Sequence, residues 1–310
     1  MIHLDHYHNK HVDRAIGCFI GLAVGDALGA PLEFGPRREV EDHTEMTAGG
    51  PFSLPAGCFT DDTSMAVALG HSLIASDGLN VDAAMKRFLQ WYWDGKYSAT
   101  GRCFDIGNQT RKALLHYDET GKPIPADVTA LGNGAIMRLA PVPVFYRQRP
   151  DYAAKYGAEQ AALTHCNLLQ ASANAWLSFS LARQIVGHAS FDTPRERADF
   201  TPGLEYLTNP EVRAAATRKW RDVPRQWITS SGHVISTLEA ALWSVATTGT
   251  FEAAVVRAVN LGDDADTIGA VTGQIAGAIY GLSGIPKRWL DALLWKDELL
   301  RLAQALLRED

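Results

Sequence analysis

Apolar residues recur at three- and four-residue spacing along most of the chain, which places them on one face of an α-helix. The spacing predicts helices over residues 12–30, 61–76, 80–93, 101–117, 151–163, 168–187, 232–247, 251–260, 265–281 and 286–307. The best strand candidate is 140–146 (APVPVFY), and its prolines argue against a central strand. The pattern therefore predicts an all-α protein.

The helical pattern continues through the chain without an internal repeat or a low-complexity linker. A chain of 310 residues can bury one large core. We therefore expect a single compact domain over residues 1–310. Two parts are polar and irregular: residues 1–11, expected to form a solvated N-terminal tail, and residues 188–231, expected to form a surface excursion.

Two of the predicted helices carry a glycine at every fourth position. These are Gly17, Gly21, Gly25 and Gly29 in the first helix, and Gly269, Gly273, Gly277 and Gly281 near the end. Glycine costs about 1 kcal/mol relative to alanine inside a helix, so eight such positions need a reason. Four-residue spacing aligns them in a stripe where another backbone can approach closely. We expect both helices to be central, packed against each other or against other elements; the alternative is relaxed composition in an alanine-rich chain.

Composition and charge narrow the classes of function. The net charge is −6 and the basic residues are scattered, so we expect no nucleic-acid binding. No uninterrupted apolar stretch reaches the roughly 20 residues of a membrane span, and the N-terminus lacks the layout of a signal peptide. Cysteines stand far apart without a Cys-x-x-Cys pair, at positions 18, 58, 103 and 166. We expect reduced thiols and a cytoplasmic protein.

The sequence FTDDTS (59–64) places two adjacent acids between two threonines, directly before an apolar helix. Thr60 suits an N-cap, and Asp61 and Asp62 suit the first turn, where the helix dipole favours negative charge. Capping alone would explain this arrangement. However, the two acids repel each other in apolar surroundings, and a buried carboxylate must be paired or bind a cation.

A second acidic motif, DDADT, stands about 200 residues later at the head of the second glycine-striped helix. It contains Asp263, Asp264, Asp266 and Thr267. Oxygen ligands without His or Cys suit Mg²⁺ or Mn²⁺. The helix N-terminus is expected to lower the pKa of these carboxyls, and a pair of cations bridged by shared aspartates would balance their charge. Together the two motifs favour a metal site over capping alone.

Three further features suggest substrate contacts. Asp105 and Asn108 lie three residues apart and are predicted to share a helix face. Asn133 lies in a glycine-rich turn between Gly132 and Gly134, where free backbone N–H groups can cradle a phosphate or a ribose, although a structural turn is commoner. His165 follows a predicted helix, and a single histidine is more often a packing residue.

Several blocks together resemble the ADP-ribosylglycohydrolase family, and within it the bacterial branch typified by dinitrogenase reductase-activating glycohydrolase. They are GDALGAPLEF, FTDDTSMA, TGRCFDIGN, GNGAIMRLAPV, THCN and LGDDADTIGAVTGQIAGAIYG, in family order over residues 15–285. The resemblance implies an orthogonal multi-helix bundle with two Mg²⁺ or Mn²⁺ ions in a central cleft. It also implies removal of ADP-ribose from modified side chains, most often arginine, or from a small ADP-ribosyl compound. We further expect a monomer.

The resemblance assigns roles to residues of this chain. Its metal ligands are Thr60, Asp61, Asp62, Asp264, Asp266 and Thr267, with Asp263 outside the ligand set. The substrate-binding positions are Asn108, Gly132, Asn133, Gly134 and His165. For catalysis we expect Asp61 or Asp105 as the base and Glu33 as a gate or a second acid, a position that matches a glutamate of serine-specific members. His233, where the family often has tyrosine, leaves the substrate identity open.

Two other functions compete with this expectation. One is a dimetal phosphoesterase, and the other is a non-catalytic protein that binds ADP-ribose or serves a structural role. A degenerate member would have lost some Asp and Thr ligands. All six metal-binding positions are present, so we expect an active hydrolase.

Overall fold

The computed structural model describes residues 9–187 and 203–307. Within these ranges the protein consists of helices and loops, with three isolated β-bridges and no strand. The all-α prediction is confirmed. Most of the expected polar tail and the segment 188–202 lie outside the described residues, and the first helix already begins at Lys10, inside the expected tail.

Most helices begin and end within a few residues of their predicted bounds. They are α1 (Lys10–Gly29), α2 (Asp61–Ser76), α3 (Val81–Asp94), α4 (Asn108–Thr120), α5 (Pro141–Phe145), α6 (Pro150–Ala162), α7 (Leu168–Val186), α9 (Pro210–Thr217), α10 (Val234–Ala246), α11 (Phe251–Val259), α12 (Ala265–Tyr280), α13 (Lys287–Ala292) and α14 (Lys296–Ala305).

The main error in the predicted helices concerns α4. It begins at Asn108 and not at residue 101, and Asp105 lies in the preceding loop with a left-handed φ of 58°. The prediction that Asp105 and Asn108 share a helix face is therefore wrong. The strand candidate 140–146 also proves helical, because a proline at the first helical position has no N–H bond to lose.

Two other regions are more segmented than predicted. The helix expected over 286–307 is interrupted at Trp295, which has a φ of 60°, and forms α13 and α14. The described part of the irregular segment 188–231 contains α9, whose N-terminus is capped by the Asn209 side chain.

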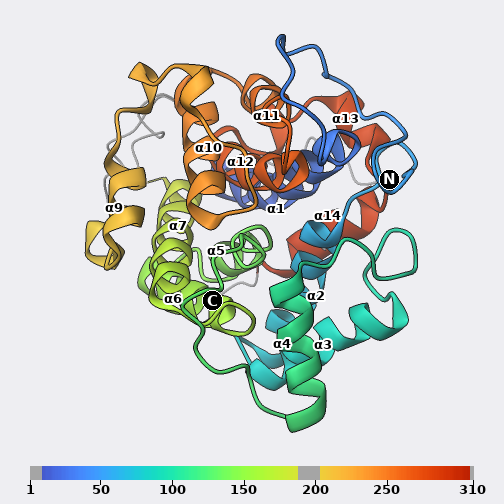
Figure 1. Ribbon diagram of the computed structural model, residues 1–310, viewed down its shortest axis with the longest axis vertical. Coiled ribbons are helices and arrows are strands. Elements are labelled where there is room, and N and C mark those ends of the chain that lie inside the picture. Colours follow the sequence, from blue (N-terminus) through green and yellow to red (C-terminus); the bar gives the residue numbers. More distant parts are fainter. Residues whose placement is uncertain (1–8, 188–202, 308–310) are drawn as a thin grey trace.

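Helices α1 and α12 lie side by side near the centre of the molecule (Figure 1). Their glycines face one another: a Cβ atom on Gly277 would lie 1.9 Å from the carbonyl oxygen of Gly17, and one on Gly273 would lie 1.9 Å from that of Gly21. No side chain fits between these backbones. The expected close packing is confirmed, and the two helices pack against each other.

The glycine contacts also give the direction of the pair. Gly17, early in α1, meets the end of α12, whereas Gly29, at the end of α1, meets Ala265 and Asp266 at its start. The helices are therefore antiparallel. This arrangement brings the residues that follow α1 next to the second acidic motif.

Helix α1 is the longest and one of the most apolar of the described helices. Contrary to the sequence expectation, the stretch Lys10–Leu32 has the length and mean hydropathy of a membrane-spanning helix. In the structure, 89% of its most apolar window is buried within the protein. Its apolar side chains thus form part of the core.

Candidate metal centre and substrate cleft

Asp26 joins the end of α1 to the start of α2. Its buried carboxylate accepts hydrogen bonds from the backbone N–H of Thr60 at 2.9 Å and of Thr63 at 3.0 Å, and from both threonine hydroxyls. Asp26 therefore satisfies two of the free N–H groups at the start of α2. Thr60 occupies the predicted N-cap position, but its side chain makes no capping bond to the helix.

The hydroxyl of Thr60, which does not cap its own helix, lies between the two acidic motifs. Its Oγ1 lies 3.0 Å from Asp26, 3.3 Å from Asp62 and 3.2 Å from Asp266. The hydroxyl of Thr267 lies 3.5 Å from the same Asp62 oxygen. The starts of α2 and α12, about 200 residues apart in the sequence, therefore meet in space.

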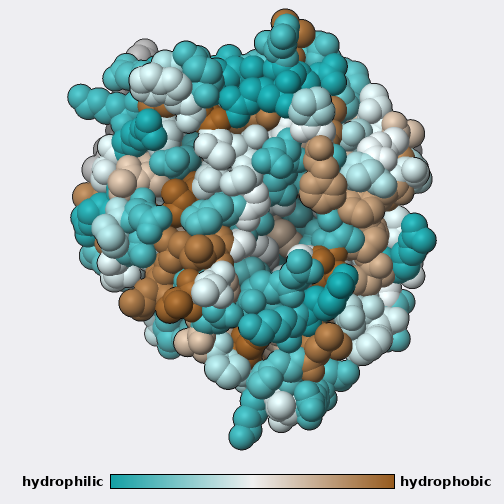
Figure 2. Space-filling model, in the orientation of Figure 1, coloured by the Kyte–Doolittle hydropathy of each residue, from teal (hydrophilic) through white to brown (hydrophobic). Residues whose placement is uncertain are grey.

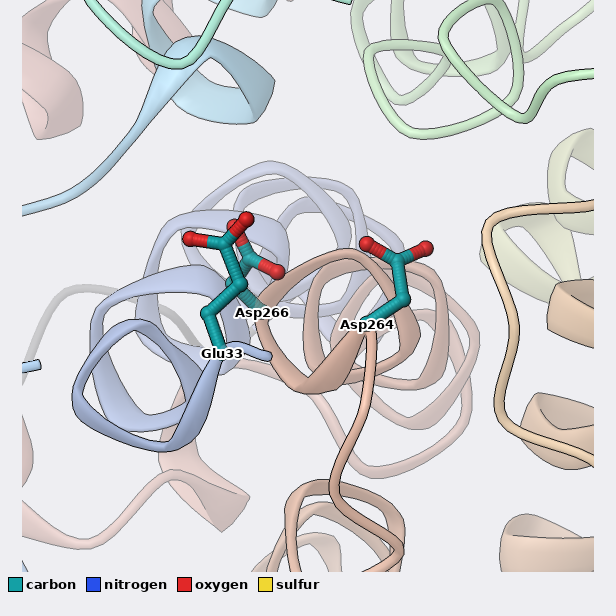
Figure 3. A group of neighbouring side chains, drawn as sticks. All are labelled: Glu33, Asp264 and Asp266. Atoms are coloured by element: carbon teal, nitrogen blue, oxygen red, sulfur yellow. The ribbon is translucent and has the colours of Figure 1, made fainter. Parts of the chain in front are cut away.

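Glu33, Asp264 and Asp266 form an acidic triad, from the loop after α1 and the start of α12. Each offers a carboxylate oxygen, and these oxygens lie within 4.8 Å of one another. Figure 3 shows the three side chains projecting to the same side of the adjacent helix ends. Glu33, expected to act only as a gate or an acid, thus lies among the predicted metal ligands.

The donor set fits a divalent cation. Buried oxygens of Glu33, Asp62 and Asp266 have no hydrogen-bond partner within the described residues. One proton on Thr60 also cannot satisfy three surrounding carboxylates. A hard cation held by carboxylate and hydroxyl oxygens would satisfy both deficits. The acidic cluster can therefore hold a metal ion.

Burial and mutual repulsion dominate the ionisation of these carboxyls. Burial, and then the neighbouring Asp266, raises the pKa of Asp26 and of Asp264 to about 7. Burial and the surrounding carboxylates raise the pKa of Glu33 to about 12 and hold those of Asp61 and Asp62 well above their usual range. As expected for helix N-termini, backbone N–H groups lower the pKa values of Asp26 and Asp266, but burial outweighs them and the net shift is upward.

A cavity of about 350 Å³ opens beside the acidic triad. Figure 2 shows the corresponding face of the molecule hollowed near its centre. Its lining includes these predicted site residues: Glu33, Asp61, Asp105, Asn108, Gly132, Asn133, Gly134, His165, Asp264, Asp266 and Thr267. Thr60 and Asp62 lie behind this lining, where they hold Asp266 and Thr267.

Asn133 also has a structural role within the protein. Its amide nitrogen donates to the Thr237 hydroxyl at 2.8 Å and to the Asp264 carboxylate. Both amide protons are thereby committed to the protein. Asn133 orients Asp264, while still lining the cleft.

His165 is tied to the buried Arg138 through the hydroxyl of Thr164. The buried Arg138 donates to the hydroxyl of Thr164 at 2.8 Å, and that hydroxyl lies 2.8 Å from His165 Nδ1. The hydroxyl can accept from arginine and donate its own proton to Nδ1, an arrangement that places the histidine proton on Nε2. Burial, with Arg138 nearby, lowers the pKa of His165 to about 3. The imidazole is thus a neutral N–H donor at the cleft.

Gly134 makes room for that ring, and Gly132 lies in contact distance of it. A Cβ atom on Gly134 would lie 2.9 Å from His165 Cε1, and one on Gly132 would lie 3.5 Å from Nε2. The turn is fixed to the loop before α10 by a bridge between Gly132 and His233. His233 caps α10 by accepting from the N–H of Ile235. Its side chain therefore acts as the N-cap of α10.

Sequence reasoning missed Asp26, Arg138 and Thr164. A signal existed for the first, because a charged residue in a glycine-striped core helix must find partners. Arg138 is likewise the one charge in an otherwise apolar block, AIMRLAPV. Their partners are distant in the sequence, so only the fold reveals what each one holds.

Comparison with known proteins agrees with this geometry. The family model of ADP-ribosylglycohydrolase matches residues 7–310. The chain belongs to the ADP-ribosylglycohydrolase family. A family relative from Serratia proteamaculans, named ADP-ribosylarginine hydrolase Tri1, is 41% identical over 96% of this chain and 80% of its own length.

Two further family relatives cover nearly the whole chain. The ADP-ribosyl-dinitrogen reductase glycohydrolase of Rhodospirillum rubrum is 34% identical over 95% of this chain and 96% of its own. A solved structure titled ADP-ribosylglycohydrolase-related protein complex superimposes with a TM-score of 0.83 at 38% identity, covering 96% of this chain and 98% of that one.

Proposed function

We propose that this member of the family is a metal-dependent hydrolase that releases ADP-ribose from modified arginine side chains. The observation that carries the proposal is the meeting of the two acidic motifs at one cleft, with the Glu33–Asp264–Asp266 triad beside it. The relatives named as ADP-ribosylarginine hydrolases, at 38% and 41% identity, support arginine as the modified residue. We further propose a cytoplasmic monomer acting on an ADP-ribosylated protein or a small ADP-ribosyl compound.

We propose two Mg²⁺ or Mn²⁺ ions as the cofactor. The predicted ligands are Thr60, Asp61, Asp62, Asp264, Asp266 and Thr267, with Asp266 bridging. Asp266 suits this role because it lies against Thr60 of one motif and within the triad of the other. Bound divalent cations hold hydroxyl oxygens of a substrate and lower the pKa of a water molecule.

The reaction splits the bond between the anomeric carbon of ribose and a guanidinium nitrogen. Water adds its oxygen to that carbon as the carbon–nitrogen bond breaks. Asp61 or Asp105 accepts the proton of the water, and Glu33 supplies a proton to the departing nitrogen. Glu33 suits the acid role because its buried side chain lies in the acidic triad and lines the cleft.

The other side of the cleft suits the ADP-ribose. Its lining there is neutral, with Asn108, the 132–134 turn and the Nε2–H of His165. Neutral donors can bind phosphate or ribose oxygens without bringing a positive charge near the metal site. We therefore propose that this side holds the nucleotide part of the substrate.

A panel of defined linkages tests the proposed function. The protein would be given ADP-ribosylarginine protein, ADP-ribosylserine peptide and simple phosphoesters, each with Mg²⁺ and with Mn²⁺. We expect free ADP-ribose from the arginine substrate. Release from the serine peptide alone would indicate an O-linked hydrolase, which the place of Glu33 in the triad also allows. Inorganic phosphate without ADP-ribose would indicate a phosphoesterase.

A further inference from the structure

One large aromatic side chain at the cleft is exposed. Phe34 lines the same cavity as the acidic triad, and 67% of its surface is accessible. Its φ of 58° lies in the left-handed region, which bulky residues rarely adopt. A strained, exposed phenylalanine at a cleft needs a reason other than packing, and such strain gathers at functional sites.

The backbone holds Phe34 firmly in this position. Its N–H donates to the carbonyl of Asp263 at 2.7 Å, and the N–H of Asp263 donates to the carbonyl of Gly35 at 2.8 Å. These two bonds join the loop after α1 to the residue directly before Asp264. The ring is therefore placed relative to the start of α12.

Phe34 is the exposed end of a row of three aromatic rings, of which the other two are half-buried. Phe52 meets Phe34 edge to face at 6.4 Å between centroids, and Phe104 meets Phe52 in the same way at 5.3 Å. We call these three residues the aromatic wall. An acidic residue stands next to each end of the wall in the sequence: Glu33 precedes Phe34, and Asp105 follows Phe104.

The charges beside the wall favour a cation. Glu33 and Asp105 both line the cleft beside the wall, and Glu33 Oε2, on a side chain only 5% exposed, has no partner within the described residues. None of the described residues that line the cleft is Lys or Arg. An aromatic face beside unpaired carboxyl oxygens is the environment in which a planar guanidinium binds best.

We propose that the aromatic wall is the subsite for the arginine side chain of the substrate, with its guanidinium stacked on Phe34 beside Glu33 and Asp105. This inference rests on the proposed function and adds the group that selects the linkage. A serine-linked substrate has no planar cation, so it gains nothing from the wall. The negatively charged diphosphate belongs on the neutral side of the cleft, away from these carboxyl groups.

The test compares two substitutions of Phe34. Phe34→Leu keeps an apolar side chain but removes the ring, and Phe34→Tyr keeps the ring. With an ADP-ribosylarginine peptide, we expect Phe34→Leu to raise KM about 10-fold, equal to ~1.4 kcal/mol, and Phe34→Tyr to stay within about 2-fold of wild type. Calorimetry with free ADP-ribose, which lacks the guanidinium, should give the same affinity for all three proteins.

Trp227→Leu is the matched control, because Trp227 is 69% exposed and lies outside the cleft lining. It should leave KM unchanged. A folded Phe34→Leu protein with wild-type KM on the arginine peptide would overturn the subsite while leaving the proposed function intact. An equal loss of affinity for ADP-ribose would also overturn it, because the wall would then hold the nucleotide. A wild-type protein that cleaves no arginine linkage would overturn both proposals.

Discussion

Arg138 is fully buried, and its partners explain its presence. Within the described residues its hydrogen bonds go to Gln160, Thr164 and the sulfur of Met65, and its guanidinium lies 4.8 Å from the ring centre of Phe88. Burial lowers its pKa to about 9, so it stays charged at neutral pH. Through Thr164 this charge is linked to Nδ1 of His165, and we infer that it favours the tautomer with the proton on Nε2.

Removing the hydroxyl of Thr164 tests this relay. In Thr164→Val the arginine loses an acceptor and His165 Nδ1 loses its donor, so the Nε2–H is no longer enforced. We expect the affinity for ADP-ribose to fall about 10-fold, consistent with ~1–3 kcal/mol for an unsatisfied buried group. Thr164→Ser should restore it. Calorimetry of the two variants decides, and wild-type affinity in Thr164→Val would show that the relay does not position His165.

At the residue scale, the sequence predicts which side chains belong to the site better than it predicts the partners that hold them. The acids and threonines of the two motifs are identifiable because several carboxylates before buried helices are costly without a cation. The hydrogen bonds that Asp26 accepts cannot be identified in this way, because its partners Thr60 and Thr63 lie at the start of another helix. The same holds for Asn133, whose amide holds Asp264.

Helix bounds were predicted well where apolar spacing is regular, as in α2, and poorly where single residues take left-handed conformations. Asp105 has a left-handed φ, and the helix expected from residue 101 begins only after it. Trp295 has a left-handed φ as well, and it separates α13 from α14. No pattern of apolar residues records such a φ angle. Helix α5 shows a different limit, since five residues carry too little periodicity to separate a strand from a helix.

The contact between α1 and α12 makes a prediction at the scale of elements. Gly273→Ala places a methyl group 1.9 Å from a backbone oxygen of α1, so the two helices must separate. We expect a loss of about 3 kcal/mol in the free energy of unfolding, measured by chemical denaturation. Because the same contact aligns the two acidic motifs, hydrolysis should fall as well.

Gly249→Ala is the control for this substitution. A Cβ atom there meets nothing within 4 Å, so stability should change by less than about 0.5 kcal/mol. Equal stability of the two variants would mean that the glycine stripes do not set the distance between α1 and α12.

At the scale of the whole molecule, one antiparallel helix pair creates the site. Helix α1 delivers Asp26 and Glu33 to the place where α12 begins with Asp264 and Asp266, and Asp26 then attaches the start of α2. The sequence predicts both glycine stripes and both acidic motifs. Their meeting follows from the direction of the pair, which sequence periodicity alone does not give.

The central claim is that the two acidic motifs form one metal-dependent site for hydrolysis. Its most direct test measures release of ADP-ribose from ADP-ribosylarginine protein, with and without Mn²⁺, by wild type, Asp266→Ala and the control Asp263→Asn. Asp263 is exposed and its side chain lies outside the cleft lining. Asp266→Ala should stay folded, because it removes one of several carboxylates that repel each other.

We expect Mn²⁺-dependent release by wild type and by Asp263→Asn, and a loss of about 1,000-fold, or ~4 kcal/mol of transition-state stabilisation, in Asp266→Ala. Wild-type turnover by Asp266→Ala in saturating Mn²⁺, or full activity of the wild-type protein in a metal chelator, would contradict the account.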